Sequence, residues 1–355
     1  MRNASPSVPR TISSAPLVGF LCFLLIASCS RSALAQASES VGVRAKGMGG
    51  AFTAVADDAT ATWWNPAGLA GGAYANVIVE YGTSQEPKDD VNSAGLAVPA
   101  GRTTTNGFAA AFPALGVSYY RLRVSEIRPL TSTAPAGGGR QDPATVAVYE
   151  QTLVLNQFGV TIGQSIGEHF VVGSTLKLVQ GSHASAVQSA DVASLDQAQE
   201  LDGPSETHGG LDLGAMASFG RNRLGLTVRN VTEIEFTSGS DTFTLKRSYR
   251  AGWAYSTGRR GVIGSSALAV DADLTTTPTP TGDERRVALG GEIWLMGQRL
   301  GLRGGVGTNT VGSRRTALSG GVSAMLLKHT YVDAAVTGGT DTGRHGWTID
   351  ARLTF

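Results

Sequence analysis

From about residue 73 to Phe355 the sequence alternates between apolar and polar side chains with a period of two. Side chains of a β-strand point alternately to opposite faces, so each such run has one apolar and one polar face. In the last run the apolar face is Trp347, Ile349, Ala351, Leu353 and Phe355, and the polar face is Thr348, Asp350, Arg352 and Thr354. The chain is therefore predicted to be an all-β protein.

The alternation divides this region into about fourteen runs, an even number. The predicted strands are 73–81, 103–112, 115–127, 149–165, 169–181, 208–219, 223–231, 243–256, 262–274, 284–294, 299–307, 316–327, 329–337 and 345–355. Short turns, such as Pro113-Ala114 and Gly297-Gln298, alternate with long polar connections. The long connections cover about 82–102, 128–146, 182–207, 232–242, 275–283, 308–315 and 338–344.

An even number of antiparallel strands, with short turns at one end and long loops at the other, is the anatomy of an outer-membrane barrel. In hydrocarbon every backbone N–H and C=O needs a partner, so the sheet must close and leave no edge. We therefore predict a closed antiparallel transmembrane β-barrel over residues 73–355, in the outer membrane of a Gram-negative bacterium. Its expected partners are outer-membrane lipid and, through a C-terminal strand ending in Phe355, the barrel-assembly machinery.

A secreted all-β protein with one wet face would show the same alternation. Its polar face should be rich in Lys and Glu, whereas charged residues are 16% of this chain, against roughly 25% in soluble domains. The formal net charge of +1 gives no basic footprint for nucleic acid, so no nucleic-acid partner is expected. Composition therefore favours the membrane barrel.

Residues 1–35 have the features of a secretory signal peptide. Arg2 and Arg10 precede an apolar run over residues 15–27, which is too short to span a bilayer as a helix. No later stretch reaches 18 consecutive apolar residues, so no transmembrane helix is predicted. The chain is expected to be exported.

Two cleavage chemistries fit this leader. Ala33-Leu34-Ala35 is a small-x-small site for cleavage after Ala35, whereas Ile26-Ala27-Ser28-Cys29 resembles a lipoprotein box in which Cys29 would be acylated. The sequence leaves both open. The chain has two cysteines, Cys22 and Cys29, so a cut after Ala35 would leave a mature chain without disulfides.

Residues 36–72 lie between the leader and the first predicted strand and have no alternating run. Trp63 and Trp64 carry large rings that need burial, and a dangling periplasmic tail would expose them. We therefore predict that this segment folds into the barrel lumen as a hatch, or plug.

Short helical turns are expected within this segment. Asp57 and Asp58 are candidate N-caps for a helix over residues 59–64, because a carboxylate can accept hydrogen bonds from the free amides of a first turn. Asn65-Pro66 should end that helix, and residues 67–69 can form another turn.

The segment also resembles a known family. The residues that carry the resemblance are Arg44, Gly47-Met48-Gly49-Gly50-Ala51, Ala56-Asp57-Asp58-Ala59 and Asn65-Pro66-Ala67-Gly68-Leu69-Ala70. They resemble the N-terminal hatch of FadL/OmpP1-type long-chain fatty acid transporters, and their form looks more like the related PorV/PorQ group. Residues 226–231 and 247–252 also look like segments of that group. The resemblance implies a plugged barrel with the Asn-Pro-Ala turn inside the lumen, but no particular cargo.

Candidate site residues follow from these expectations. The hatch or gate residues are Trp63, Trp64, Asn65, Pro66, Ala67 and Gly68. A charge in mid-bilayer costs roughly 2–4 kcal/mol for Arg or Lys, so charges on the strands should face the lumen. The predicted lumen charges are Arg250, Asp271, Asp273, Arg286, Glu292, Arg303, Asp333, Asp350 and Arg352. Their mixed signs favour mutual pairing and docking of the hatch, with a path for a polar solute as the alternative.

No catalytic or metal-binding pattern emerges. The five histidines, His169, His183, His208, His329 and His345, are scattered without His-x-His or Cys partners, so no metal, cofactor or enzyme activity is predicted. The favoured function is passive uptake of a hydrophobic, fatty-acid-like molecule through a hatch-gated lumen. The alternative is a PorV-like barrel that docks exported proteins or a secretion machinery component.

Overall fold

The structure is a computed structural model, and it describes residues 41–86, 100–129, 147–189, 194–238, 241–258, 263–279, 282–312, 314–339 and 345–355. The described residues belong to one compact unit, Ala33–Phe355. The predicted signal peptide, residues 1–35 with its two cleavage alternatives, lies outside them and stays a prediction.

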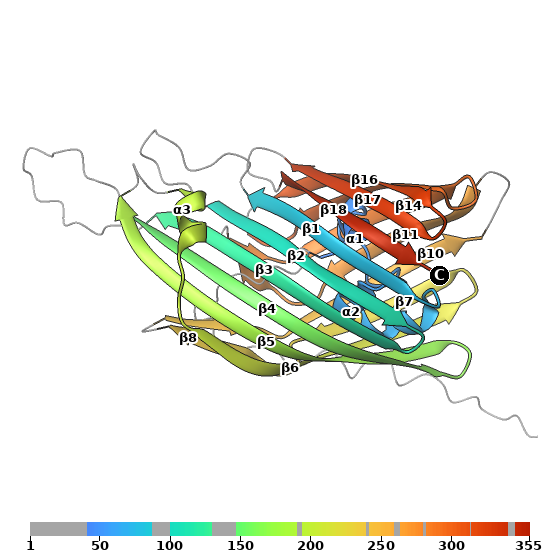
Figure 1. Cartoon of the computed structure of the whole chain (residues 1–355), viewed down its shortest axis with the longest axis horizontal. Coiled ribbons are helices and arrows are strands. Elements are labelled where there is room, and N and C mark those ends of the chain that lie inside the picture. The colour runs from blue at the N-terminus through green and yellow to red at the C-terminus, as the bar shows by residue number, and fades with distance from the viewer. Residues whose placement is uncertain are drawn as a thin grey trace, which may run out of the picture. The chain divides into compact units, whose positions relative to one another are not determined.

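Fourteen antiparallel strands form a closed barrel, and β1 pairs with β18 to close it (Figure 1). The barrel strands are β1 (Asn76–Glu86), β2 (Ala100–Phe112), β3 (Leu115–Pro129), β4 (Ala147–Ile166), β5 (Phe170–Ser189), β6 (Ser205–Phe219), β7 (Asn222–Arg229), β10 (Ser248–Thr257), β11 (Ile263–Asp273), β14 (Arg286–Leu295), β15 (Leu300–Asn309), β16 (Thr316–Leu327), β17 (Thr330–Gly339) and β18 (His345–Thr354). Each corresponds to one predicted strand, so the predicted fold class is confirmed.

The alternation sorts the side chains as predicted. On β18, Trp347 and Ile349 are exposed on the outer face, whereas Asp350 and Arg352 are buried on the inner face. Large exposed apolar side chains recur on the outer face of every wall, from Val79 on β1 to Leu353 on β18. Such an apolar exterior suits contact with lipid, and the closed ladder satisfies the backbone without water.

The outer half of β3 departs from this scheme. Its apolar residues Tyr120, Leu122 and Val124 point into the lumen and are almost completely buried. Arg121, between them, is exposed on the outer face. This half of β3 adjoins a long connection rather than a short turn, so its outer face is at the edge of the lipid, where a charge costs little.

Three further elements lie in connections that were predicted as polar loops. They are the hairpin β8 (Ile234–Ser238) and β9 (Asp241–Leu245), the hairpin β12 (Thr277–Thr279) and β13 (Gly282–Glu284), and the helix α3 (Leu195–Glu200). The predicted strand 243–256 was therefore wrong at its start, because residues up to Leu245 pair with β8 and the barrel strand begins at Ser248.

The N-terminal segment, residues 41–72, forms α1 (Val43–Gly47), α2 (Ala61–Trp64) and a 3-10 helix, η1 (Pro66–Gly71). α1 and α2 lie inside the ring of strands (Figure 1). None of the helices among the described residues has the length and apolar character required to cross a membrane.

The lipid-facing assignment makes a direct prediction on β5. The test variant replaces Leu176, which is exposed on the outer face of β5, by Arg. The control replaces Gln164, which is exposed on β4 beside a short turn, by Arg. Leu176→Arg should lower the free energy of unfolding from lipid by roughly 2–4 kcal/mol, and Gln164→Arg by no more than about 1 kcal/mol. Urea titration of the barrel folded in phospholipid vesicles measures both, and equal losses would contradict the assignment.

Candidate functional site

The N-terminal segment reaches opposite walls of the barrel. α1 contacts β15, β16, β17 and β18, whereas η1 contacts β4, β5 and β6. Between these ends, Thr53 and Ala54 pass close to β7 and β10. The segment therefore crosses the lumen and touches the inner face on several sides.

Inward glycines make room for this crossing. A Cβ added at Gly290 or Gly305 would overlap the backbone of Met48, and one at Gly173 would overlap the backbone of Pro66. The same holds for Gly225, where a Cβ would lie 2.6 Å from the Thr53 carbonyl oxygen. The wall therefore receives the segment's backbone at positions where any side chain would exclude it.

Arg44 on α1 is the main ionic anchor of the segment. Its guanidinium donates two hydrogen bonds to Glu292 on β14, at 3.0 and 2.8 Å, and one to Asp58 at 2.7 Å. It also donates to Asp57 at 2.7 Å. Burial alone would lower the pKa of Arg44, but these three carboxylates hold that pKa well above its ordinary value, so the side chain stays charged. Arg303 donates to the same Glu292 at 2.6 Å.

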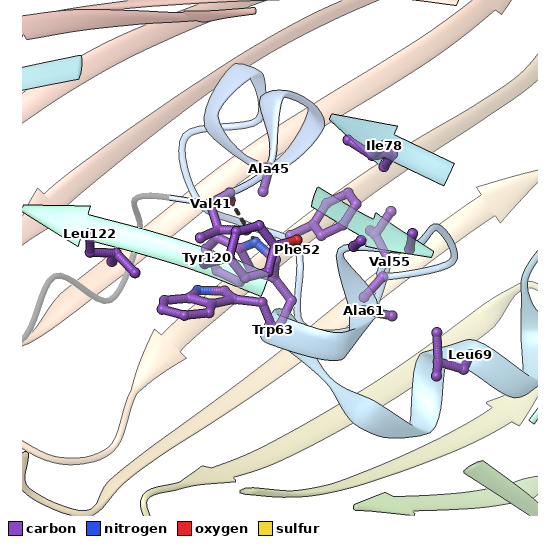
Figure 2. Close-up of a cluster of buried hydrophobic side chains, with 14 of the residues drawn as sticks. Val41, Ala45, Phe52, Val55, Ala61, Trp63, Leu69, Ile78, Tyr120 and Leu122 are labelled. Carbon is purple, nitrogen blue, oxygen red and sulfur yellow. Dashed lines mark hydrogen bonds between the residues drawn. The ribbon is translucent and has the colours of Figure 1, made fainter. Parts of the chain in front are cut away.

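The two tryptophans are buried, as predicted, but in different surroundings. Trp63 packs edge-to-face on Tyr120 of β3 with ring centroids 5.5 Å apart (Figure 2). The Arg229 guanidinium lies 3.9 Å from the centroid of the Trp63 ring. Trp64 donates a hydrogen bond from Nε1 to the Val41 carbonyl at 2.9 Å, and Arg250 of β10 lies 5.2 Å over its ring. Trp63 therefore joins the segment to the barrel wall, while Trp64 contacts both the segment and the wall.

Asn65 links the segment's own turn to the wall. Its side-chain amide donates to the carbonyl of Thr53 at 3.0 Å and to that of Ala215 on β6 at 3.3 Å. Its carbonyl oxygen accepts from Ala67 at 3.2 Å, which caps η1. Pro66, Ala67 and Gly68 are also buried. Hence the predicted gate residues lie together, in contact with β4–β6.

Of the two predicted cap residues, Asp58 bonds at the start of α2. The N-cap residue of α2 is Thr60, and no side chain of its own makes a cap hydrogen bond. Asp58 accepts hydrogen bonds from the amide and hydroxyl of Thr60, at 2.9 and 2.5 Å. Asp57 bonds to Arg44 instead. The buried guanidinium therefore takes the Asp57 carboxylate and shares that of Asp58 with the start of the helix.

All nine predicted charges face the lumen, in separate groups rather than one network. Arg303 joins Glu292, and Arg352 joins Asp333 at 2.8 Å. Arg286 joins Glu284, which was not predicted, at 3.0 Å.

Arg250 and Asp271 also dock the segment. Asp271 accepts from the amides of Phe52 and Thr53 at 3.0 and 2.8 Å, and Arg250 donates to the Gly50 carbonyl at 3.0 Å. Arg250 lies 3.3 Å from Asp271 and 3.4 Å from Asp273.

One predicted charge breaks the pairing scheme. Asp350 is opposite Asp333 on one side and opposite Glu80 on the other in the strand register, so three carboxylates stand side by side. Glu80 was not among the predicted charges, although it is on the polar face of the first run; its carboxylate accepts from the Gly42 amide at 2.8 Å.

A second buried ion pair was also missed. Lys177 on β5 lies 2.7 Å from Asp212 on β6, and donates to the Asn230 side chain at 2.6 Å. Each charge is isolated within its own run, so the sequence alone gave no sign that the register would bring them together.

Cavities lie on both sides of the N-terminal segment. The loop-side cavity has about 650 Å³ of empty space, and its walls include Lys46, Ser84, Thr103 and Thr337. The turn-side cavity has about 1050 Å³, and its walls include Arg44 and residues beside the short turns such as Gln298. α1 contributes to both, Lys46 to one and Arg44 to the other. Among the described residues no group of acidic, His or Cys side chains is suited to hold a metal ion.

Residues 32–273 match the family described as "F plasmid transfer operon, TraF, protein". The comparison with curated proteins gives no match.

Solved structures resemble the whole barrel. The toluene transporter TbuX of Ralstonia pickettii is 13% identical with a TM-score of 0.55, covering 90% of this chain and 99% of that one. The monoaromatic hydrocarbon channel CymD is 14% identical with a TM-score of 0.59, covering 90% and 99%. A FadL homologue of Pseudomonas aeruginosa is 12% identical with a TM-score of 0.54, covering 88% and 98%.

These matches share the fold of this chain, a closed antiparallel barrel, and its apolar outer face suits a place in an outer membrane. They do not bear on the resemblance to the PorV/PorQ group, which stays a prediction, as does docking of exported proteins.

The glycine contacts predict an asymmetry between two neighbouring positions. Gly305→Leu should displace the N-terminal segment, because its side chain would need the place of the Met48 backbone, whereas Gly304→Leu points outward where nothing lies within 4 Å. Trypsin can cut after Arg44 and Lys46, both in α1. Gly305→Leu should speed that cleavage about tenfold, and Gly304→Leu should leave it unchanged. Similar rates in the two folded variants would contradict the packing.

The ionic anchor gives a second prediction. Arg44→Ala leaves Glu292 and Asp58 with a buried charge that has lost a partner, at a cost of roughly 3–5 kcal/mol in docking of α1. Hydrogen exchange of the amides of residues 45–48 should therefore speed up strongly. Arg247→Ala, at an exposed position, is the control. Unchanged exchange in Arg44→Ala would show that α1 is held by packing alone.

Proposed function

This chain belongs to the TraF family that its residues 32–273 match, and we propose that it is a hatch-closed channel for passive uptake of hydrophobic, fatty-acid-like small molecules. The carrying observation is that one short segment crosses the lumen with a cavity on each side. The family description names an operon and no ligand, so the ligand class rests on the geometry and on the structural neighbours.

The lumen has an apolar side on which a hydrophobic molecule can lie. Tyr120, Leu122 and Val124 of β3 and Leu153 and Leu155 of β4 are inward and buried. Ligand sites in proteins are mostly apolar cavities with few polar groups, and these strands supply such a wall. The names of TbuX and CymD describe a toluene transporter and a hydrocarbon channel, and we extend that class, rather than an enzymatic one, to this chain.

In this proposal residues 1–35 are the signal peptide, 36–72 the hatch and 73–355 the barrel. The gate is the N-terminal segment itself. Trp63, Trp64, Asn65, Pro66, Ala67 and Gly68 hold its second half against β4–β6, and Arg44 holds its first half against β14. Uptake requires α1 to move away from the wall, since α1 separates the two cavities.

A reversible crosslink tests the gating. A Cβ at Gly47 would lie 3.4 Å from Cβ of Arg303 on β15. This is close to the separation of about 3.5–4.5 Å between the Cβ atoms of a disulfide. Oxidised Gly47→Cys/Arg303→Cys should take up labelled toluene or oleate about tenfold more slowly in proteoliposomes than its reduced form.

The matched control crosslinks the wall alone. Gly304 and Gly320 are register partners on the outer face of β15 and β16. Gly304→Cys/Gly320→Cys should therefore transport equally in both redox states. If the barrel with the oxidised hatch crosslink takes up the probe at the rate of its reduced form, the hatch is not the gate. If the wild-type barrel takes up neither toluene nor oleate, the proposed function is wrong.

A further inference from the structure

The strands β8 and β9, here called the outer hairpin, do not extend from the barrel rim but lie inside the lumen. β8 contacts the inner faces of β5 and β6. Its apolar side chains alternate with polar ones, and Ile234, Phe236, Phe243 and Leu245 are almost completely buried. Glu235 and Thr237, between them, are exposed.

The seat of the hairpin is shaped for an aromatic ring. A Cβ added at Gly181 of β5 would lie 2.5 Å from the ring of Phe236. The Phe236 ring stacks on Phe243, with centroids 6.3 Å apart and planes at 20°, and the His208 ring meets its edge at 5.1 Å. Two stacked rings therefore fill a position where the barrel wall has no side chain.

The hairpin completes the apolar side of the lumen. Phe236, Phe243, Ile234 and Leu245 belong to one buried cluster. The wall residues in that cluster are Tyr120, Leu122, Val124, Leu153, Leu155 and Val179. Without the hairpin, the outer part of this wall would face the open mouth of the barrel. A small gap remains beside Phe243, lined by residues that include Val124, Leu153 and His183.

The hairpin is fastened at its base, and farther out it is held by packing and by one hydrogen bond, from the Thr237 amide to the Glu206 carboxylate of β6 at 3.3 Å. At the base, the side-chain oxygen of Asn230 accepts a hydrogen bond from Lys177, and its side-chain nitrogen donates to the Lys246 carbonyl at 3.1 Å. The backbone N–H of Asn230 donates to the Asp212 carboxylate at 2.7 Å. Beyond it, β8 and β9 pair with each other as a separate two-stranded sheet. Undocking the hairpin therefore breaks no rung of the barrel ladder, and an isolated hairpin is only marginally stable.

From this geometry we propose that the outer hairpin is a displaceable lid, and that it covers the binding place of an incoming apolar, ring-containing molecule on the wall of β3 and β4. The molecule lies against Val124 and Leu153 when the hairpin leaves them. This rests on the proposed uptake function and adds a second closure, on the loop side of the hatch. Because lid and ligand compete, the closed lid weakens apparent affinity in proportion to the time it spends closed.

Two glycines allow a matched test. Gly181→Leu puts a side chain where the Phe236 ring lies, whereas Gly209→Leu, on the neighbouring strand β6, has nothing within 4 Å. Both are made with a reporter, Leu153→Cys, on the covered wall. N-phenylmaleimide labels the reporter in purified barrel in lipid nanodiscs, and mass spectrometry assigns the label to position 153. The second readout is binding of the fluorescent apolar probe N-phenyl-1-naphthylamine, without the reporter.

The expected result is a labelling rate at position 153 about tenfold higher in Gly181→Leu than in wild type, and no change in Gly209→Leu. The apparent Kd of the probe should fall severalfold in Gly181→Leu, and bound probe should protect position 153 from the label in either background. Unchanged labelling overturns the lid. Faster labelling without tighter probe binding would contradict the proposed ligand-binding site under the hairpin, because the hairpin would then be only a structural cover.

The lid and the proposed uptake function can be contradicted independently of each other. Labelling and probe binding need no transport, so they can succeed when the hatch crosslink shows no gating. Conversely, Gly181→Leu with wild-type labelling, in a barrel whose uptake stops when the hatch is crosslinked, would remove the lid and leave the proposed uptake function intact.

Discussion

The bilayer's demand for a sheet without edges governs the rest of this molecule. Closing fourteen strands with β1 against β18 satisfies the backbone, but it also commits one face of every strand to a single enclosed interior. Charges excluded from lipid must then share that interior. Arg44, Glu292 and Arg303 show the result, since a segment from outside the barrel supplies a cation that the wall's own carboxylate uses.

The two ends of the N-terminal segment are held by different physics. α1 is fixed by a charged cluster in which each member would be costly to bury alone. η1 is fixed by hydrogen bonds of Asn65 to carbonyl groups and by close packing of Pro66 on Gly173. An ionic contact responds to a change of charge, and a packed one to a change of volume. The segment can therefore be released at one end while the other remains in place.

The sequence was sufficient for the barrel because alternation with a period of two reports directly on which face meets lipid. From it the fourteen strands could be located, and all nine of the chosen charges could be assigned to the lumen face. It could not assign their partners, because these depend on the register and on Arg44, which is far away in sequence. It also gave no sign that the Arg44 guanidinium would bind Asp57 and share Asp58 with the start of α2.

The outer hairpin and the reversed half of β3 were missed for one reason. Ile-Glu-Phe-Thr-Ser and Asp-Thr-Phe-Thr-Leu around Gly239-Ser240 form a good hairpin signal, but the region was taken as a long polar connection. Once the hairpin is inside the lumen, the wall opposite it must be apolar, so Tyr120, Leu122 and Val124 point inward.

The inward glycines that receive the N-terminal segment also affect how the sequence of such a chain can evolve. The wall meets the segment's backbone at Met48, Thr53 and Pro66, not chiefly its side chains. At residues of the segment that contact the wall only through their backbone, the side chain can be substituted, provided that the main chain keeps its path. The facing positions, Gly173, Gly225, Gly290 and Gly305, have no such freedom. Relatives with the same arrangement should therefore differ more in sequence within the N-terminal segment than at the wall positions that face it.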